Sequence, residues 1–278
     1  MKRAFLFIAI IVSLNIHVTG HVSAEEVAST PSEEIMTPGL EYFKGYWHDG
    51  KHIVTSPARW DADDWLKAGA VVGVTLGLYA VDEDIQEWFR DNRSEGSDNF
   101  TDYIEPFGNG LFLVPSLGVV YAYGYFSDNT RLARASLIGL ESYVVSGLIV
   151  NAIKFTGHRH RPDEGGGAYS WEGPSFDSDF LSFPSGHSAS AWSVAAVVAS
   201  EYEENRYVAP IAYGIATLTA LSRVHDDRHW TSDVFMGAAI GYFTGKTIHK
   251  LHSDSSDNMV LIPVINDDSA ILVATFRF

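Results

Sequence analysis

Cysteine is absent from the 278 residues of this chain, and basic residues are scarce. Without Cys the chain cannot form disulfides, thiolate zinc sites, iron–sulfur clusters or a cysteine nucleophile. Lys and Arg number 19 against 35 Asp and Glu, which gives a formal charge of −16. A nucleic-acid binder, or a protein that docks on anionic lipid through a polybasic patch, needs the opposite balance. We therefore expect no nucleic-acid partner.

Charged residues are sparse overall, at 19%, whereas hydrophobic residues make up 46% of the chain, which is typical of a folded protein. The first 24 residues stand apart. Lys2 and Arg3 precede an apolar run over residues 4–16, and small residues follow at 22–24. This pattern is typical of a cleaved secretory signal peptide, with an uncleaved anchor helix as the alternative. We expect an exported protein, periplasmic or envelope-associated, with an integral membrane protein as the alternative.

Hydrophobic periodicity and capping residues predict a helical domain after the signal. The expected helices cover residues 62–89, 109–126, 129–154, 185–203, 206–223 and 231–251. Asp128 is the expected N-cap of the third helix. A long polar loop, residues 157–184, separates the third helix from the fourth, and its His158 and His160 are interpreted as solvated.

The two ends of the chain differ from this helical part. Residues 25–60 are rich in aromatic side chains and predict an arm with little regular structure. Near the C-terminus, two apolar segments flank turn residues 266–269, which predicts a small β-hairpin. The expected organisation is a signal peptide at 1–24, an arm at 25–60, a helical domain at 61–252 and a hairpin tail at 253–278.

Two features favour a bundle whose helices do not cross a bilayer. The integral membrane protein stays open as the alternative. The apolar stretches inside the expected helices are mostly shorter than the about 20 residues that a crossing requires. Glu141 lies midway along the expected helix 129–154, where a charge in lipid would be costly.

Three clusters of polar residues lie where the expected helices begin or end. The first is Lys154 with Arg161-Pro162, the second is Pro184-Ser185-Gly186-His187, and the third is Ser222-Arg223 with His229 and Asp233. In an antiparallel bundle joined by turns, such helix ends can share one face of the domain. Cations gathered at one place in an acidic protein indicate an anionic substrate.

The residue types indicate a phosphoryl group as that anion. The guanidinium groups of Arg161 and Arg223 match phosphate oxygens with paired N–H donors, and Lys154 adds a point charge. The backbone N–H groups of Ser185 and Gly186 lie at the start of a helix, where free donors and the helix dipole favour an anion. Such a cationic array disfavours a metal ion, so we expect neither a metal nor a cofactor.

Two histidines supply the chemistry of phosphoryl transfer. His229 and Asp233 are four residues apart and therefore share one helix face. A carboxylate that accepts the Nδ1 proton leaves Nε2 with a lone pair, which makes His229 a nucleophile able to form a phosphohistidine. His187, beside the anion-binding backbone, can protonate the leaving alkoxide and later deprotonate water.

Taken together, the motifs Lys154-x6-Arg161-Pro162, Pro184-Ser185-Gly186-His187 and Ser222-Arg223-x5-His229-x3-Asp233 resemble the signature of the type 2 phosphatidic acid phosphatases. That superfamily includes bacterial acid phosphatases and vanadium-dependent haloperoxidases. The resemblance implies an all-α six-helix bundle, to which the hairpin is an addition. It also implies His229 as nucleophile with Asp233 as its partner, and His187 as general acid. The implied phosphate ligands are Lys154, Arg161, Ser185, Gly186 and Arg223.

The expected function is metal-independent hydrolysis of phosphate monoesters through a phosphohistidine. Lipid phosphates, such as phosphatidate or an isoprenyl pyrophosphate, are the favoured substrates. One alternative is a haloperoxidase that would hold vanadate as its cofactor between the same phosphate-binding residues. A second is a soluble periplasmic acid phosphatase, and a third is a non-catalytic phosphate-binding scaffold.

Overall fold

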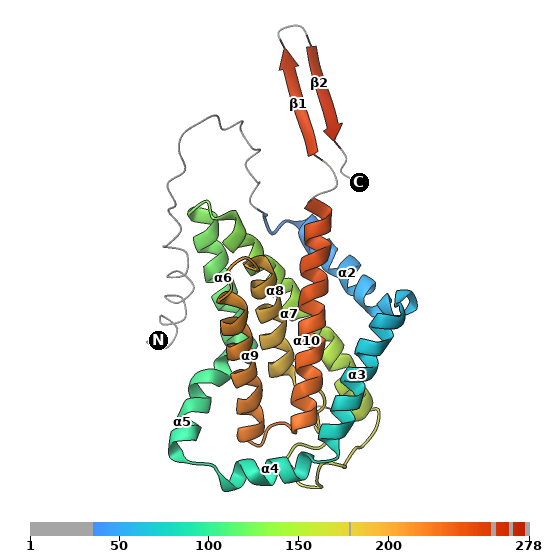
Figure 1. The fold of residues 1–278 in the computed structure, drawn as a ribbon, viewed down its shortest axis with the longest axis vertical. Coiled ribbons are helices and arrows are strands. Elements are labelled where there is room, and N and C mark those ends of the chain that lie inside the picture. Colours follow the sequence, from blue (N-terminus) through green and yellow to red (C-terminus); the bar gives the residue numbers. More distant parts are fainter. Residues whose placement is uncertain (1–35, 178, 257–259, 267–268, 276–278) are drawn as a thin grey trace.

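The computed structural model describes residues 36–177, 179–256, 260–266 and 269–275. Its body is a bundle of long helices that run side by side (Figure 1). These helices are α6 (Gly110–Phe126), α7 (Thr130–Gly157), α8 (Gly186–Glu201), α9 (Val208–His225) and α10 (Thr231–Ser256). Each corresponds to one of the helices that periodicity predicts, with ends shifted by only a few residues.

Capping residues set the starts of two of these helices. Ser185 caps α8, since its hydroxyl oxygen accepts the N–H of Ser188 at 3.4 Å. At α7 the carboxamide of Asn129 accepts the N–H of Leu132 at 3.0 Å. The prediction of Asp128 as this cap is therefore wrong by one residue, because Asp128 takes a left-handed backbone conformation with φ 53°.

The helix expected over residues 62–89 is interrupted. It consists of α3 (Ala62–Tyr79) and α4 (Asp82–Asp91), which are bent by 58° relative to each other. The acidic residues of the first turn of α4 favour a new helix start, because they complement its dipole. Helix α5 (Glu95–Ile104) and the 3₁₀ turn η2 (Glu105–Gly108) follow, and neither was predicted. Figure 1 shows α4 lying across the lower end of the bundle and α5 running up along its side.

The arm also contains regular structure. Helix α2 (Leu40–Val54) and the 3₁₀ turn η1 (Ser56–Arg59) occupy its second half. For these residues the prediction of little regular structure is wrong. Figure 1 places α2 beside the C-terminal half of α10, far from the lower end of the bundle. The predicted signal peptide, residues 1–24, lies outside the described residues.

Beyond α10, two strands pair antiparallel in the tail. They are β1 (Val260–Asn266) and β2 (Ser269–Thr275), and Asn266 lies opposite Ser269 across the turn. The strands extend away from the bundle in Figure 1.

Glycine allows α8 and α10 to pack closely. A Cβ atom added at Gly237, Gly241 or Gly245 of α10 would collide with backbone carbonyl oxygens of α8. These glycines recur every fourth residue, so they form one stripe along α10. The close packing fixes the start of α8 against the start of α10, and both helix starts carry predicted site residues.

One helix is long and apolar enough to cross a membrane, in the part of the chain that the structure describes. It is α7, and half of its most apolar window is buried inside the protein. The bent pair α3 and α4 passes the same test if it is counted as one segment. The apolar stretches were expected to be too short to cross a bilayer, and α7 is an exception to this expectation. Large hydrophobic side chains on α3 and α6 are exposed, among them Leu66, Leu76, Leu111 and Phe126.

Candidate active site

The predicted site residues meet at the lower end of the bundle, where α7 and α9 end and α8 and α10 begin (Figure 1). Their charges act on one another across this end. The ammonium group of Lys154 acts on both His187 and His229, and the guanidinium of Arg161 acts on both His229 and Arg223. The structure therefore brings the three cations and the two imidazoles into one site.

His229 is buried in the turn just before α10, and Asp233 is buried in the first turn of that helix, so the two residues do not share a helix face as predicted. Oδ2 of Asp233 lies 3.7 Å from Nδ1 of His229, which is longer than a hydrogen bond. Both carboxylate oxygens of Asp233 already accept other donors. Oδ2 accepts the hydroxyl of Ser182 at 2.5 Å and the N–H of Trp230 at 2.9 Å, and Oδ1 accepts Arg159. The carboxylate is thus held in place beside the ring by neighbours other than the ring itself.

Arg159 is the central member of this support. Its side chain is fully buried, and one nitrogen, Nη1, donates to Asp233 at 2.5 Å and to Ser232 at 2.8 Å. The other terminal nitrogen donates to Oδ2 of Asp82 at 2.8 Å, and Asp82 is also fully buried. One guanidinium therefore joins two buried carboxylates from separate helices.

Helix α4 forms the base of the site through this contact and others. Oδ1 of Asp82 accepts the N–H of Ser232 at 2.9 Å, so a hydrogen bond joins α4 to the start of α10. Gln86 and Arg90 both donate to Oδ1 of Asp227, at 2.7 Å each, in the turn that leads to His229. Sequence reasoning missed Asp82 and Arg159, which are 77 residues apart and carry no shared motif.

Glu105 is a further residue that sequence reasoning missed. Its Oε1 lies 2.7 Å from Nε2 of His187 and 3.7 Å from Nη1 of Arg223. Glu105 belongs to the unpredicted turn η2, and no motif indicates that its carboxylate would face these groups. A Cβ added at Gly108 would collide with the backbone of His187, and this close approach keeps η2 against the start of α8.

The remaining predicted ligands line the same place. The ammonium group of Lys154 donates to the carbonyl of Leu181. Arg161 is partly exposed, with 29% of its side chain accessible, and its nearest carboxylate is that of Glu164 at 3.9 Å. The N–H of Ser185 donates to the carbonyl of Asp233 at 2.9 Å, so this donor is engaged within the protein. Open space surrounds the Cα of Gly186 on its side-chain side.

Burial and charge set the protonation of the two histidines. Burial, and after it the cations Lys154 and Arg161, lower the pKa of His229 to about 3 against the opposing effect of Asp233, so its imidazole is neutral at ordinary pH. Burial and Arg223 lower the pKa of His187, and Glu105 opposes them.

The acidic partner remains ionised. Burial alone would raise the pKa of Asp233, but His229 and the Arg159 guanidinium hold it below its usual value. The site thus pairs a neutral imidazole with an anchored carboxylate.

Comparison with known proteins found a family model that matches the part of the chain that holds this site. Residues 135–257 match the family model described as the PAP2 superfamily. A lipid A 1-phosphatase of Porphyromonas gingivalis is 29% identical over 177 residues, which cover 63% of this chain and 36% of that protein. The chain therefore spans about a third of the length of this curated relative.

Two solved structures are similar to the chain at low sequence identity. One is a transmembrane PAP2 type phosphatidylglycerolphosphate phosphatase from Bacillus subtilis, with a TM-score of 0.48, 19% identity, and coverage of 77% of this chain and 96% of that one. The other is LpxE of Aquifex aeolicus, with a TM-score of 0.47, 22% identity, and coverage of 60% and 93%.

The matched segment, residues 135–257, contains all of the residues in the three sequence motifs. This segment, which is less than half of the chain, is similar to the PAP2 superfamily.

Proposed function

We propose that this protein is a phosphatase that hydrolyses lipid phosphates through a phosphohistidine at His229, without a metal ion. The observation that carries the proposal is an apolar cavity that begins one helical turn from His187 and leads away from the cationic site. The lipid part of the substrate would lie in this cavity, and its phosphate would lie among the cations.

The phosphate would be held by side chains and by one helix start. Arg161 and Arg223 would donate to its oxygens in pairs, and Lys154 would supply a third positive charge. Because the N–H of Ser185 is engaged with Asp233, the backbone donors that we assign are those of Gly186 and His187, the first residues of α8. The hydroxyl of Ser185 remains able to donate a further hydrogen bond.

The reaction would proceed in two steps. In the first, Nε2 of His229 attacks phosphorus, the bond between phosphorus and the ester oxygen breaks, and His187 gives its proton to the departing alkoxide. In the second, His187 takes a proton from water as the water oxygen attacks phosphorus, and inorganic phosphate leaves His229. Asp233 would stabilise the imidazole of His229 while it carries the additional positive charge.

The cavity is suited to an acyl or isoprenyl chain. It has a volume of about 490 Å³ and is lined mostly by apolar residues of α6, α7, α8 and α9, with Arg131 and Glu204 also in its wall. Ala191 lines it and lies four residues after His187, so both occupy one face of α8. Ala195 and Val198 continue that face away from the site. Since His187 is the proton donor to the leaving group, the leaving group would be the lipid alcohol that extends along this face.

The protein surface agrees with a place at a membrane. Large hydrophobic side chains of α3 and α6 are exposed, and α7 is long and apolar. The predicted export signal puts the site outside the cytoplasm. We therefore propose an envelope-associated enzyme, with the integral membrane protein as the alternative. The named relatives act on lipid A 1-phosphate and phosphatidylglycerolphosphate, and both substrate types fit a phosphate joined to a long apolar group.

A cavity-filling variant tests the proposal. Ala191→Phe would fill the cavity next to His187, and we expect it to lower kcat/KM for a long-chain lipid phosphate in mixed micelles by about tenfold or more. Hydrolysis of p-nitrophenyl phosphate should change little, because that substrate does not reach the cavity. Ala80→Phe, outside the cavity, is the control. An equal loss on both substrates would refute the assigned lipid path.

Vanadate separates the phosphatase from the haloperoxidase. Vanadate should inhibit phosphate release by binding among the residues that would hold the substrate's phosphate. Halide oxidation by peroxide that appears on addition of vanadate would instead support the peroxidase.

A further inference from the structure

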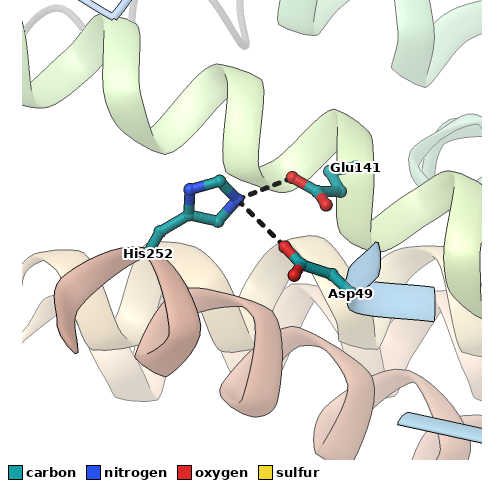
Figure 2. A group of neighbouring side chains, drawn as sticks. All are labelled: Asp49, Glu141 and His252. Carbon is teal, nitrogen blue, oxygen red and sulfur yellow. Dashed lines mark hydrogen bonds and ion pairs between the residues drawn. The ribbon is translucent and has the colours of Figure 1, made fainter. Parts of the chain in front are cut away.

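A second cluster of chemically active side chains lies at the opposite end of α10. Figure 2 shows Asp49 of α2, Glu141 of α7 and His252 of α10 pointing toward one another. His252 follows Asp233 by 19 residues on the same helix. At about 1.5 Å per residue the two positions are about 29 Å apart, so this cluster is separate from the phosphatase site.

The three side chains offer one nitrogen and two oxygens to a common point. Nε2 of His252 lies 2.7 Å from Oε2 of Glu141 and 3.6 Å from Oδ2 of Asp49. All three ligand atoms lie within 4.8 Å of one another. Ligand atoms around a tetrahedral zinc ion are separated by about 3.3 Å, since each bond is about 2.0–2.1 Å long. Small side-chain shifts would therefore convert this cluster into three ligands of one ion.

The cluster has an unsatisfied oxygen and excess negative charge. Glu141 is fully buried, and its Oε1 is buried without a hydrogen-bond partner. Within the described residues, no Lys or Arg forms an ion pair with Asp49 or Glu141, and a single imidazole faces both carboxylates. The buried carboxylates of the phosphatase site differ, because Arg159 compensates them there. A buried carboxylate oxygen without a donor is costly, and a divalent cation would satisfy it.

A neighbouring hydroxyl orients the cluster. The hydroxyl of Tyr42 donates to Oε2 of Glu141 at 3.3 Å, and its ring lies 5.8 Å from that of His252. Outer groups of this kind fix the direction of metal ligands in proteins. Asp49 and His252 each keep 12–17% of their side chains exposed, so an ion can enter from solvent.

We propose that Asp49, Glu141 and His252 form a binding site for a divalent transition-metal ion, with Zn²⁺ as the ion that the donor set fits best. One imidazole and two carboxylates suit such an ion better than Mg²⁺ or Ca²⁺, which take oxygen ligands in larger number. A water molecule would complete the four ligands. On binding, the ion replaces the hydrogen bond between His252 and Glu141, and any proton on Nε2 is released to solvent.

The ion would fasten α2 to the bundle. Each ligand comes from a different helix, and Asp49 is the one that α2 contributes. Metal binding would therefore stabilise the docked position of α2 against α7 and α10, and this role does not involve hydrolysis.

Calorimetric titration and thermal unfolding with Zn²⁺ test the site in the tag-free full chain. We expect one equivalent to bind saturably and to raise Tm by several degrees, whereas Mg²⁺ does neither. Glu141→Gln and His252→Gln should each weaken binding at least tenfold. Asp49→Asn, at a ligand less buried than Glu141, gives the same test with less risk to folding.

Two matched controls locate the ion. His249→Gln alters the same helix at a comparable histidine, whose Nε2 lies 2.9 Å from Glu201, and should leave Zn²⁺ binding unchanged. His48→Gln removes an exposed histidine of α2 next to Asp49 and should also leave it unchanged. Absence of saturable binding, or binding that survives the three ligand variants and is lost in His48→Gln, would overturn the proposal.

Discussion

Arg159→Met offers a quantitative test of how the candidate active site is supported. The substitution keeps a long apolar stem in a fully buried position and removes the guanidinium. Asp82 and Asp233 then remain as buried carboxylates without their cation. Breaking a buried ion pair from one side costs about 3–5 kcal/mol, because the remaining charge is uncompensated. We expect the free energy of unfolding, from urea denaturation, to fall by about that amount.

The same substitution should change catalysis in a specific way. Arg159 holds Asp233 but is not assigned to the phosphate, so its loss should disturb the imidazole of His229 rather than substrate binding. We expect kcat to fall by about 10–100-fold, as for other residues that support an active group, with KM little changed. Adding Asp82→Asn should restore part of the lost stability, because it removes one of the two uncompensated charges.

Arg161→Met is the matched comparison, two residues away in the same loop. The Arg161 side chain is partly exposed and makes one long contact with Glu164. Arg161→Met should therefore change the free energy of unfolding by no more than about 0.5 kcal/mol. Its kcat/KM should fall instead through weaker substrate binding. Equal effects of the two substitutions on stability, or an Arg159→Met protein within about 1 kcal/mol of wild type, would refute the reasoning.

Three further predictions follow from the site. Between pH 6.5 and about 3, the unfolded chain binds a proton at His229 that the folded chain does not. The free energy of unfolding should therefore fall on acidification by up to about 1.4 kcal/mol per pH unit from this group. Urea denaturation of the wild type and of His229→Gln over this pH range checks it, and an equal dependence of the unfolding free energy on pH in both proteins contradicts it. Glu105→Gln should lower the pKa of His187, because Glu105 raises it, and the basic limb of the pH–rate profile should move to lower pH; an unmoved limb would separate Glu105 from the proton transfer. EDTA should leave hydrolysis unchanged while it removes the stabilisation of α2 by Zn²⁺; activity lost to EDTA and restored by Zn²⁺ or Mg²⁺ would contradict a metal-independent reaction.

The long helices could be predicted because their signals are local. Apolar periodicity and a cap such as Ser185 depend on neighbouring residues, and α6 to α10 begin and end close to the expected positions. Two local predictions failed. Helix α2 was missed, and two of its large apolar side chains, Leu40 and Trp47, face solvent. The break between α3 and α4 was missed because residues 80–81, at the bend, include no proline or glycine.

The site residues likewise fall into two groups, those that a local motif predicts and those that only the fold brings together. The motif residues are recognisable because phosphate chemistry requires particular side chains at fixed spacing, as with His229 and Asp233. Arg159, Asp82 and Glu105 are ordinary charged residues in sequence, and only the fold brings them to the site. His158 illustrates the same limit. It was interpreted as solvated, yet it is buried, with 2% of its surface exposed, where the loop folds back over the end of α7.

The central claim is that His229 is the nucleophile, and trapping of the phosphoenzyme tests it most directly. Rapid acid-free denaturation during turnover of a ³²P-labelled substrate, followed by peptide mapping, should find a base-stable, acid-labile phosphoryl group on His229. The label should be absent in His229→Ala and should accumulate in His187→Ala with an activated leaving group. Label on a different residue, or normal turnover by His229→Ala, would contradict the account.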